Sequence, residues 1–275
     1  MIAFVGAGPG AADLITLRGR DRLAAADIVV WASSLVPEAL LTHTRPGVQV
    51  HDSAGMTLED VLAVYEANPH AAIVRLHSGD PSLYGALQEQ LDWCEAHGRA
   101  YEVVPGVSAL AGAAASLGRE LTVPQVAQSV VLTRLAGRTA ASMPERESVS
   151  AFARHGTTMA VFLSAARPEV LQAELLAGGS GYDEATPAAI VVRATWPDEQ
   201  VVETTVGHLA RDLAATGART TVLVLVGPAL APRGDAPVAR SHLYSPAFAH
   251  MFRRRSAPGT TTGRPAWPER SGGPA

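Results

Sequence analysis

The chain has 275 residues, 47% of them hydrophobic, which is enough for one large domain or two domains of ordinary size. Its net charge is −4 and all 22 basic residues are arginines, which argues against a nucleic-acid partner and excludes a lysine nucleophile. The single cysteine, Cys94, excludes an internal disulfide and a cysteine-rich metal site, and it is expected to be a packed thiol.

No apolar run reaches the roughly 18 residues that a membrane-spanning helix needs. The chain opens on a strand and not on a signal peptide. We therefore expect a cytoplasmic protein with no membrane partner.

The first 118 residues alternate short, β-branched apolar runs with helical patterns. The expected strands span residues 2–5, 27–31, 48–51, 71–76 and 101–104. The expected helices span residues 17–26, 37–41, 58–65 and 109–117, with one more that starts at residue 81. Strands that alternate with helices predict a doubly wound, mostly parallel sheet, so residues 1–118 are interpreted as an N-terminal α/β domain.

Residues 119–230 are interpreted as a second, C-terminal α/β domain with a mixed sheet, entered through a linker at 118–128. Its expected strands are 129–134, 158–163, 188–193, 201–205 and 220–226, and its expected helices are 146–154, 168–177 and 206–215. The strand at 201–205 is predicted to be antiparallel, because only a tight connection precedes it. Residues 137–144 are expected to form a polar loop, and the aperiodic residues 231–275 a disordered tail.

Three turns rich in glycine or proline follow strands of the first domain, at 6–10, 79–81 and 105–108. Glycines let a backbone turn tightly and approach a ligand closely. Ligands of open α/β sheets bind beyond the carboxyl ends of the strands, so the three turns predict a binding rim. Asp80 is expected to cap a helix whose first residue is Pro81.

The first turn formally satisfies a dinucleotide-binding pattern through Gly6, Gly8 and Ala11, but two features argue against that function. Pro9 removes a backbone N–H from the loop, and residues 32–34 lack the acid that would bind a ribose. There is no zinc-binding histidine pair, so no metal is expected. There is also no G-x-S-x-G elbow and no phosphate-binding loop, which argues against covalent catalysis and phosphate transfer. What remains is chemistry whose reactive group arrives on a small molecule.

The chain resembles the tetrapyrrole methyltransferases of corrin and sirohaem biosynthesis over roughly residues 2–229. The matching blocks are Val5–Gly10, Asp13–Gly19, Gly79-Asp80-Pro81 with Tyr84-Gly85, and Val104–Ser108. Four further blocks look like the branch that methylates C11 of precorrin-4: Asp52–Met56, Leu76–Gly85, Leu132-Thr133-Arg134 with Gly137-Arg138-Thr139, and Arg193–Glu199. Ser78 stands where that family more often has threonine, a change that keeps the hydroxyl.

The resemblance implies the tetrapyrrole methylase fold, with S-adenosyl-L-methionine bound in a cleft between the domains and S-adenosyl-L-homocysteine released as product. The implied cofactor contacts, many of them through backbone atoms, are Pro9, Ser78, Gly79, Asp80, Leu83, Ser108, Ala109, Leu163 and Ala194. It also implies a homodimer and an anionic tetrapyrrole as substrate. Arg75, Arg119 and Arg134 are candidates for binding the acidic side chains of that substrate.

Three side chains are candidates for catalytic proton transfer, namely Asp80, His77 and Asp52. For His77, which lies beside a glycine turn, a structural, hydrogen-bonded role is the alternative; for Asp80, the alternative is capping. At the level of function, a sibling enzyme that methylates C1, C17 or C20, a nicotinamide-dependent precorrin reductase and a non-catalytic tetrapyrrole carrier remain open.

Overall fold

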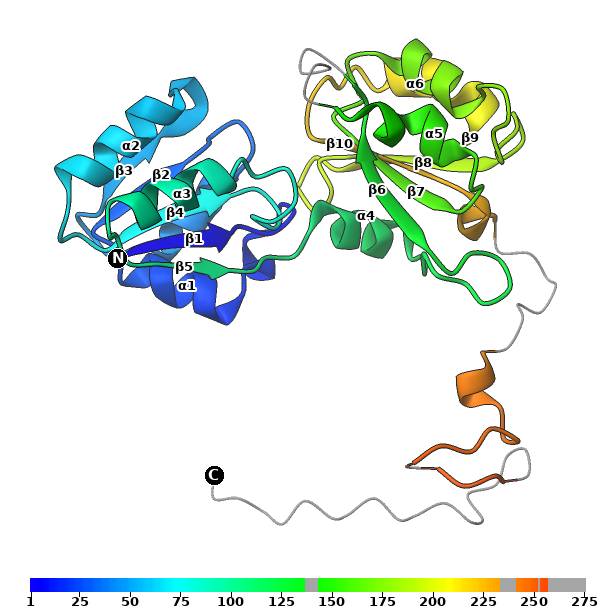
Figure 1. The fold of residues 1–275 in the computed structure, drawn as a ribbon, viewed down its shortest axis with the longest axis horizontal. Helices are drawn as coiled ribbons and strands as arrows, with labels where there is room; N and C mark the ends of the chain where they lie inside the picture. The colour runs from blue at the N-terminus through cyan, green and yellow to red at the C-terminus, as the bar shows by residue number, and fades with distance from the viewer. Residues whose placement is uncertain (137–142, 233–240, 252, 257–275) are drawn as a thin grey trace.

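The fold was analysed in a computed structural model that describes residues 1–136, 143–232, 241–251 and 253–256. The first sheet contains β1 (Ile2–Gly6), β2 (Ile28–Trp31), β3 (Gln49–Asp52), β4 (Ile73–His77) and β5 (Tyr101–Val104). Its strand order is β3-β2-β4-β1-β5, and every neighbouring pair is parallel. The doubly wound parallel sheet predicted for this half is therefore confirmed (Figure 1).

Helices cover both faces of this sheet. The side chains of β1 alternate between the faces, as a strand buried on both sides requires. Ala3 and Val5 pack with Leu23 of α1 (Leu17–Ala24). On the other face, Ile2 and Phe4 pack against α2 (Leu58–Ala67) and α3 (Gln88–Ala96), whose buried residues include Cys94. Short 3₁₀ helices occupy Ala12–Leu14, Glu38–His43 and Ser53–Gly55.

The second sheet contains β6 (Val130–Arg134), β7 (Thr158–Phe162), β8 (Pro187–Val192), β9 (Gln200–Thr205) and β10 (Val222–Val226). Its order is β6-β7-β10-β8-β9. β6 pairs with β7 in parallel, whereas β10 is antiparallel to both of its neighbours and β9 is antiparallel to β8. The predicted mixed sheet and the antiparallel strand near 201–205 are both confirmed.

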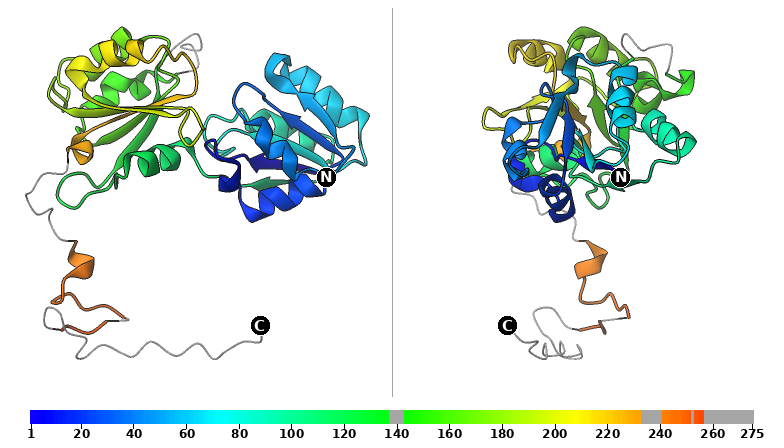
Figure 2. Two further views of the ribbon diagram at one scale, coloured as in Figure 1. Left: turned by 180° about the vertical axis from the view of Figure 1, so that it is seen from behind. Right: turned by 90° about the vertical axis from the view of Figure 1, so that its left-hand side faces the viewer.

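Helices cover the second sheet unequally. One face packs against α5 (Val149–Ala153), α6 (Pro168–Leu175) and α7 (Leu209–Ala215). The opposite face packs against α4 (Ala109–Leu117), whose Ala113 is buried with Leu223 and Leu225 of β10 (Figure 2). Because α4 precedes residue 118, a segment on the N-terminal side of the predicted boundary completes the core of the second domain. Among the described residues, further 3₁₀ helices span Glu145–Glu147, Val206–His208, Pro228–Leu230 and His242–Tyr244.

The prediction that Asp80 caps a helix beginning at Pro81 is wrong. Residues 81–84 form a turn, and α3 begins only at Gln88. Tyr84 and Ala86 have left-handed backbone angles, with φ of 57° and 46°, which a right-handed helix cannot contain. The turn is also compact, because a Cβ at Gly85 would lie 2.3 Å from the carbonyl oxygen of Pro81.

Two predictions fall partly outside the described residues: the loop at 137–144 and the tail at 231–275. The described part of the tail contains the helix His242–Tyr244 and a turn in which His250 and Arg253 pair through their backbones. Within the described ranges, no helix is both long and apolar enough to cross a membrane.

Candidate functional site

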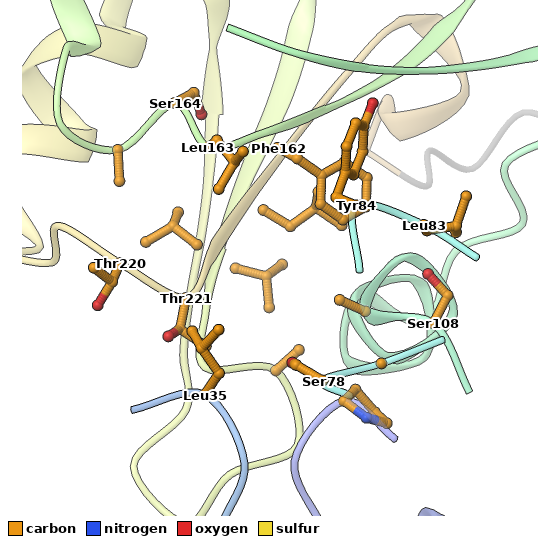
Figure 3. Close-up of a pocket in the computed structure, with 18 of the residues that line it drawn as sticks. Leu35, Ser78, Leu83, Tyr84, Ser108, Phe162, Leu163, Ser164, Thr220 and Thr221 are labelled. Carbon is orange, nitrogen blue, oxygen red and sulfur yellow. The ribbon is translucent and has the colours of Figure 1, made fainter. Parts of the chain in front are cut away.

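A cavity of about 320 Å³ lies between the two domains (Figure 3). The first domain lines it with the turns that follow β1, β4 and β5, together with Leu35. The second domain contributes Phe162 at the end of β7 with residues 163–166 after it, Ala194 after β8, and residues 219–223, which lead into β10. All the residues predicted to contact a cofactor line this cavity: Pro9, Ser78, Gly79, Asp80, Leu83, Ser108, Ala109, Leu163 and Ala194.

The three predicted turns meet at the carboxyl ends of β1, β4 and β5. Gly8 and Gly79 exchange two backbone hydrogen bonds, of 3.2 Å from Gly8 N–H and 2.9 Å from Gly79 N–H. A Cβ at Gly106 would lie 2.2 Å from the carbonyl oxygen of Gly79 and 2.7 Å from Cα of Gly6. Glycine is required at this crossing because backbone packs directly on backbone there.

The carboxylate of Asp80 joins two of these turns. One oxygen accepts a 2.9 Å hydrogen bond from the backbone N–H of Gly106, and the other accepts from the N–H and the hydroxyl of Ser82. Burial, the largest single influence, raises the pKa of Asp80, but the hydrogen bonds from Ser82 and Gly106 together lower it below its ordinary value. Asp80 is therefore an ionised group in the cavity wall at neutral pH.

His77 is buried at the end of β4 and does not line the cavity. Burial, helped by the positive charge of Arg75, lowers its pKa to about 3, so the imidazole is neutral at physiological pH. Its Nε2 atom is buried without a hydrogen-bond partner. The neighbouring Arg75 guanidinium donates to the hydroxyl of Ser53 at 2.8 Å.

Asp52 lies at the end of β3, outside the cavity lining. Its carboxylate accepts hydrogen bonds from the hydroxyl and the N–H of Ser33, at 2.6 and 3.1 Å, and from the N–H of Ala54 at 2.9 Å. The bond from the Ser33 hydroxyl is the main cause of its lowered pKa. Asp52 thus anchors the loop that carries Leu35 to the cavity. For Asp80, His77 and Asp52 alike, a role in proton transfer stays a prediction.

Left-handed backbone angles gather around the cavity. Tyr84, Leu163 and Thr221 line it with φ of 57°, 53° and 56°. Arg193 and Thr195 flank the lining residue Ala194 with φ of 50° and 66°. Such angles are costly for residues other than glycine and concentrate at functional sites. Sequence reasoning missed Tyr84 and Thr221 as lining residues, since no sequence pattern marks a left-handed tyrosine or threonine.

The wall of the cavity also bridges the domains through an aromatic pair that sequence reasoning did not find. The rings of Tyr84, in the first domain, and Phe162, at the end of β7, have centroids 5.1 Å apart (Figure 3). Tyr84 lies in a turn and Phe162 at the end of a strand, 78 residues apart in the sequence. The two rings meet only because the domains pack together. Leu163 extends the same wall with two-thirds of its surface exposed (67%).

The candidate arginines differ in what they contact. The Arg119 guanidinium forms a 3.1 Å ion pair with Glu203. Among the described residues Arg75 forms no ion pair, and Arg134 lies at the end of β6 in register with Phe162.

Comparisons with known proteins place the chain among proteins of one family. The family model of the tetrapyrrole (corrin/porphyrin) methylases matches residues 1–210. The cobalt-precorrin-4 C(11)-methyltransferase of Methanocaldococcus jannaschii is 41% identical over 255 residues, which is 92% of this chain and 96% of that protein. The precorrin-4 C(11)-methyltransferase of Rhodococcus erythropolis is 45% identical over 89% of this chain and 96% of its own length.

Solved structures match both domains. The X-ray structure of a cobalt-precorrin-4 methyltransferase, a cobalamin biosynthetic enzyme, superposes with a TM-score of 0.80 at 40% identity and covers 84% of this chain and 96% of its own. A uroporphyrin-III C-methyltransferase from Thermus thermophilus, solved in complex with S-adenyl homocysteine, superposes with a TM-score of 0.69 at 30% identity and covers 83% and 98%. With the family model spanning both domains and relatives of this similarity, the chain belongs to the tetrapyrrole (corrin/porphyrin) methylases.

Proposed function

We propose that this protein is an S-adenosylmethionine-dependent methyltransferase that methylates C11 of precorrin-4, or of cobalt-precorrin-4, to give precorrin-5 in cobalamin biosynthesis. The observation that carries the proposal is the cavity between the domains, which gathers all the residues assigned to the cofactor by resemblance. The names and similarity of the relatives support the choice of substrate and ring carbon.

The residues present fit a sulfonium cofactor. The cavity volume of about 320 Å³ lies within the usual range for small-molecule sites. Gly79 lines the cavity without a side chain, so a ligand can approach its backbone closely, while Gly6 and Gly106 pack against it outside the lining. Asp80 contributes a negative charge to the wall, which favours a cation in the cavity.

S-adenosylmethionine, when bound, supplies a methyl group made electrophilic by a positively charged sulfur. The chain then contributes position and environment. Its glycine turns and the serines at 78 and 108 orient the bound molecule, and Tyr84, Phe162 and Leu163 wall the cavity and exclude water. Orientation of this kind is worth on the order of 7–11 kcal/mol in well-aligned reactions, so no nucleophilic side chain is required.

The deciding experiment incubates the purified protein with precorrin-4 and S-adenosylmethionine labelled with ¹³C in the methyl group, and locates the new methyl by NMR. We expect label at C11. Label at C1, C17 or C20 would identify a sibling enzyme, while NADPH oxidation without methyl transfer would identify a reductase. A parallel reaction with cobalt-precorrin-4 tells which form the enzyme prefers. The cytoplasmic location and the homodimer stay predictions.

A further inference from the structure

The block Arg193–Glu199 contributes only Ala194 to the cavity wall, yet two of its other residues contact the first glycine turn. The backbone N–H of Ala11 donates to the Thr195 hydroxyl at 2.9 Å, across 184 residues of sequence. The indole N–H of Trp196 donates to the carbonyl of Pro9 at 3.0 Å. A Cβ at Gly10 would lie 2.3 Å from Cδ1 of Trp196, so the turn and the indole are in direct contact.

The two residues that hold the turn are themselves held. The Arg193 guanidinium lies 3.8 Å from the centre of the Trp196 ring and donates to Asp198 at 2.7 Å. The Glu199 carboxylate accepts hydrogen bonds from the backbone N–H of Thr195 and, at 2.7 Å, from the hydroxyl of Ser116 on α4. These contacts fix Thr195 in its left-handed conformation, with φ of 66°, so that its hydroxyl faces the turn.

Helix α4 supports the same turn from another side. A Cβ at Gly112 would lie 2.8 Å from Cβ of Pro9, so the helix backbone packs on the proline ring. Pro9 and Ala194 line the cavity, whereas Thr195 and Trp196 do not. Thr195 and Trp196 therefore act on the cavity only through the backbone of the turn that they hold.

We infer that Thr195 and Trp196 are positioning residues that hold residues 9–11, at the end of the first glycine turn, against the second domain. They thereby fix the position of Pro9 in the cavity wall before the ligand binds. The identity of that ligand, S-adenosylmethionine, rests on the proposed function. Without these contacts the turn can move away from Ala194, and the cofactor must order it on binding, which weakens affinity.

The first test compares Thr195→Val with Thr195→Ser. Valine keeps the β-branched shape but removes the hydroxyl, and serine keeps the hydroxyl. Hydrogen exchange of the ligand-free protein should be faster over residues 7–12 in Thr195→Val and unchanged in Thr195→Ser. Equal exchange in both variants and the wild type would overturn the inference, whatever the protein binds.

The second test measures S-adenosylmethionine affinity by titration calorimetry. Loss of one such hydrogen bond should raise Kd about three- to tenfold in Thr195→Val and in Trp196→Phe. Trp93→Phe is the matched control, because Trp93 lies on α3 outside the cavity lining and should leave Kd unchanged. In turnover assays with precorrin-4 and S-adenosylmethionine, KM for S-adenosylmethionine should rise in Thr195→Val and Trp196→Phe. Their kcat at saturating S-adenosylmethionine should stay near the wild-type value.

The outcomes separate the two proposals. If the wild type binds no S-adenosylmethionine, the proposed function fails, and the exchange experiment still decides on the inference. If the wild type binds S-adenosylmethionine, and Thr195→Val and Trp196→Phe both bind it with the wild-type Kd, the inference is overturned and the proposed function stands.

Discussion

The carboxylate of Asp80 serves the cavity mainly through the backbone that it holds. Its oxygens accept hydrogen bonds from Gly106 and from Ser82, and the bond from Gly106 joins the turn after β4 to the turn after β5. Asp52 does the same for the loop at Ser33. At the scale of single residues, both carboxylates accept hydrogen bonds from backbone N–H groups and hydroxyls, an arrangement that favours their charged form.

His77 makes stability depend on pH. Its pKa of about 3 in the folded protein lies below the roughly 6.5 of an exposed histidine, so the unfolded chain binds the proton more readily between these values. The contribution of His77 to stability is therefore complete above about pH 6.5 and is lost as the pH falls toward the folded value.

We expect the wild type to lose about 1.4 kcal/mol of unfolding free energy from this residue between pH 7.5 and pH 5.5. His77→Gln should lack that part of the loss, as measured by urea unfolding at the two pH values. His70→Gln, at an exposed position, should retain it. A pH dependence identical in wild type and His77→Gln would contradict a buried, neutral His77.

At the scale of elements, the glycine crossing determines how closely three strand ends approach. The turns after β1, β4 and β5 share one contact in which Gly6, Gly79 and Gly106 touch through backbone atoms. The parallel arrangement places these strand ends at one edge of the sheet, where Gly79 lines the cavity and Gly6 and Gly106 pack against it outside the lining.

Gly106→Ala should displace the cavity-lining Gly79, because its methyl group would lie 2.2 Å from the carbonyl oxygen of Gly79, a backbone atom that cannot rotate away. We expect a loss of about 2 kcal/mol or more in unfolding free energy, the size typical of overpacking. Cofactor affinity should fall in parallel by calorimetry. Gly178→Ala, where the added Cβ meets nothing within 4 Å, is the control and should differ little from wild type. Wild-type affinity in Gly106→Ala would refute the expectation that the glycine crossing positions Gly79 for the cofactor.

At the scale of the whole molecule, the two domains share the segment that links them. Helix α4 follows the last strand of the first sheet, yet its Ala113, Leu110 and Leu117 pack on the second sheet. The same helix contacts Pro9 through Gly112 and Glu199 through Ser116. The connection is thus part of the second core and of the cavity wall at once.

A fragment of residues 107–230 should therefore be more stable than one of residues 119–230. The shorter fragment leaves the face around Ala160, Leu223 and Leu225 uncovered and exposes apolar surface to water. Thermal unfolding followed by circular dichroism should give a lower midpoint, or aggregation, for the shorter fragment alone. Equal midpoints would mean that α4 adds nothing to the second core.

Local sequence patterns and motifs were enough to predict the strands, the three turns and the family of this protein. Apolar runs such as Ile2–Val5 and Ile73–Val74 are local signals, and glycine and proline mark turns at their ends. Because parallel strands place their carboxyl ends at one edge, the meeting of the turns followed from topology. The nine cofactor positions came from motif resemblance, and they lie together around one cavity.

The contacts of the polar groups in those motifs could not be predicted from the sequence, because they depend on the complete fold. Asp80 accepts a hydrogen bond from Gly106, 26 residues away, and Thr195 accepts one from Ala11, 184 residues away. The left-handed Tyr84 and Leu163 are likewise set by the packing of two domains. Local sequence cannot specify such contacts, because a side chain with several possible hydrogen-bond partners takes the one that the completed fold brings within reach.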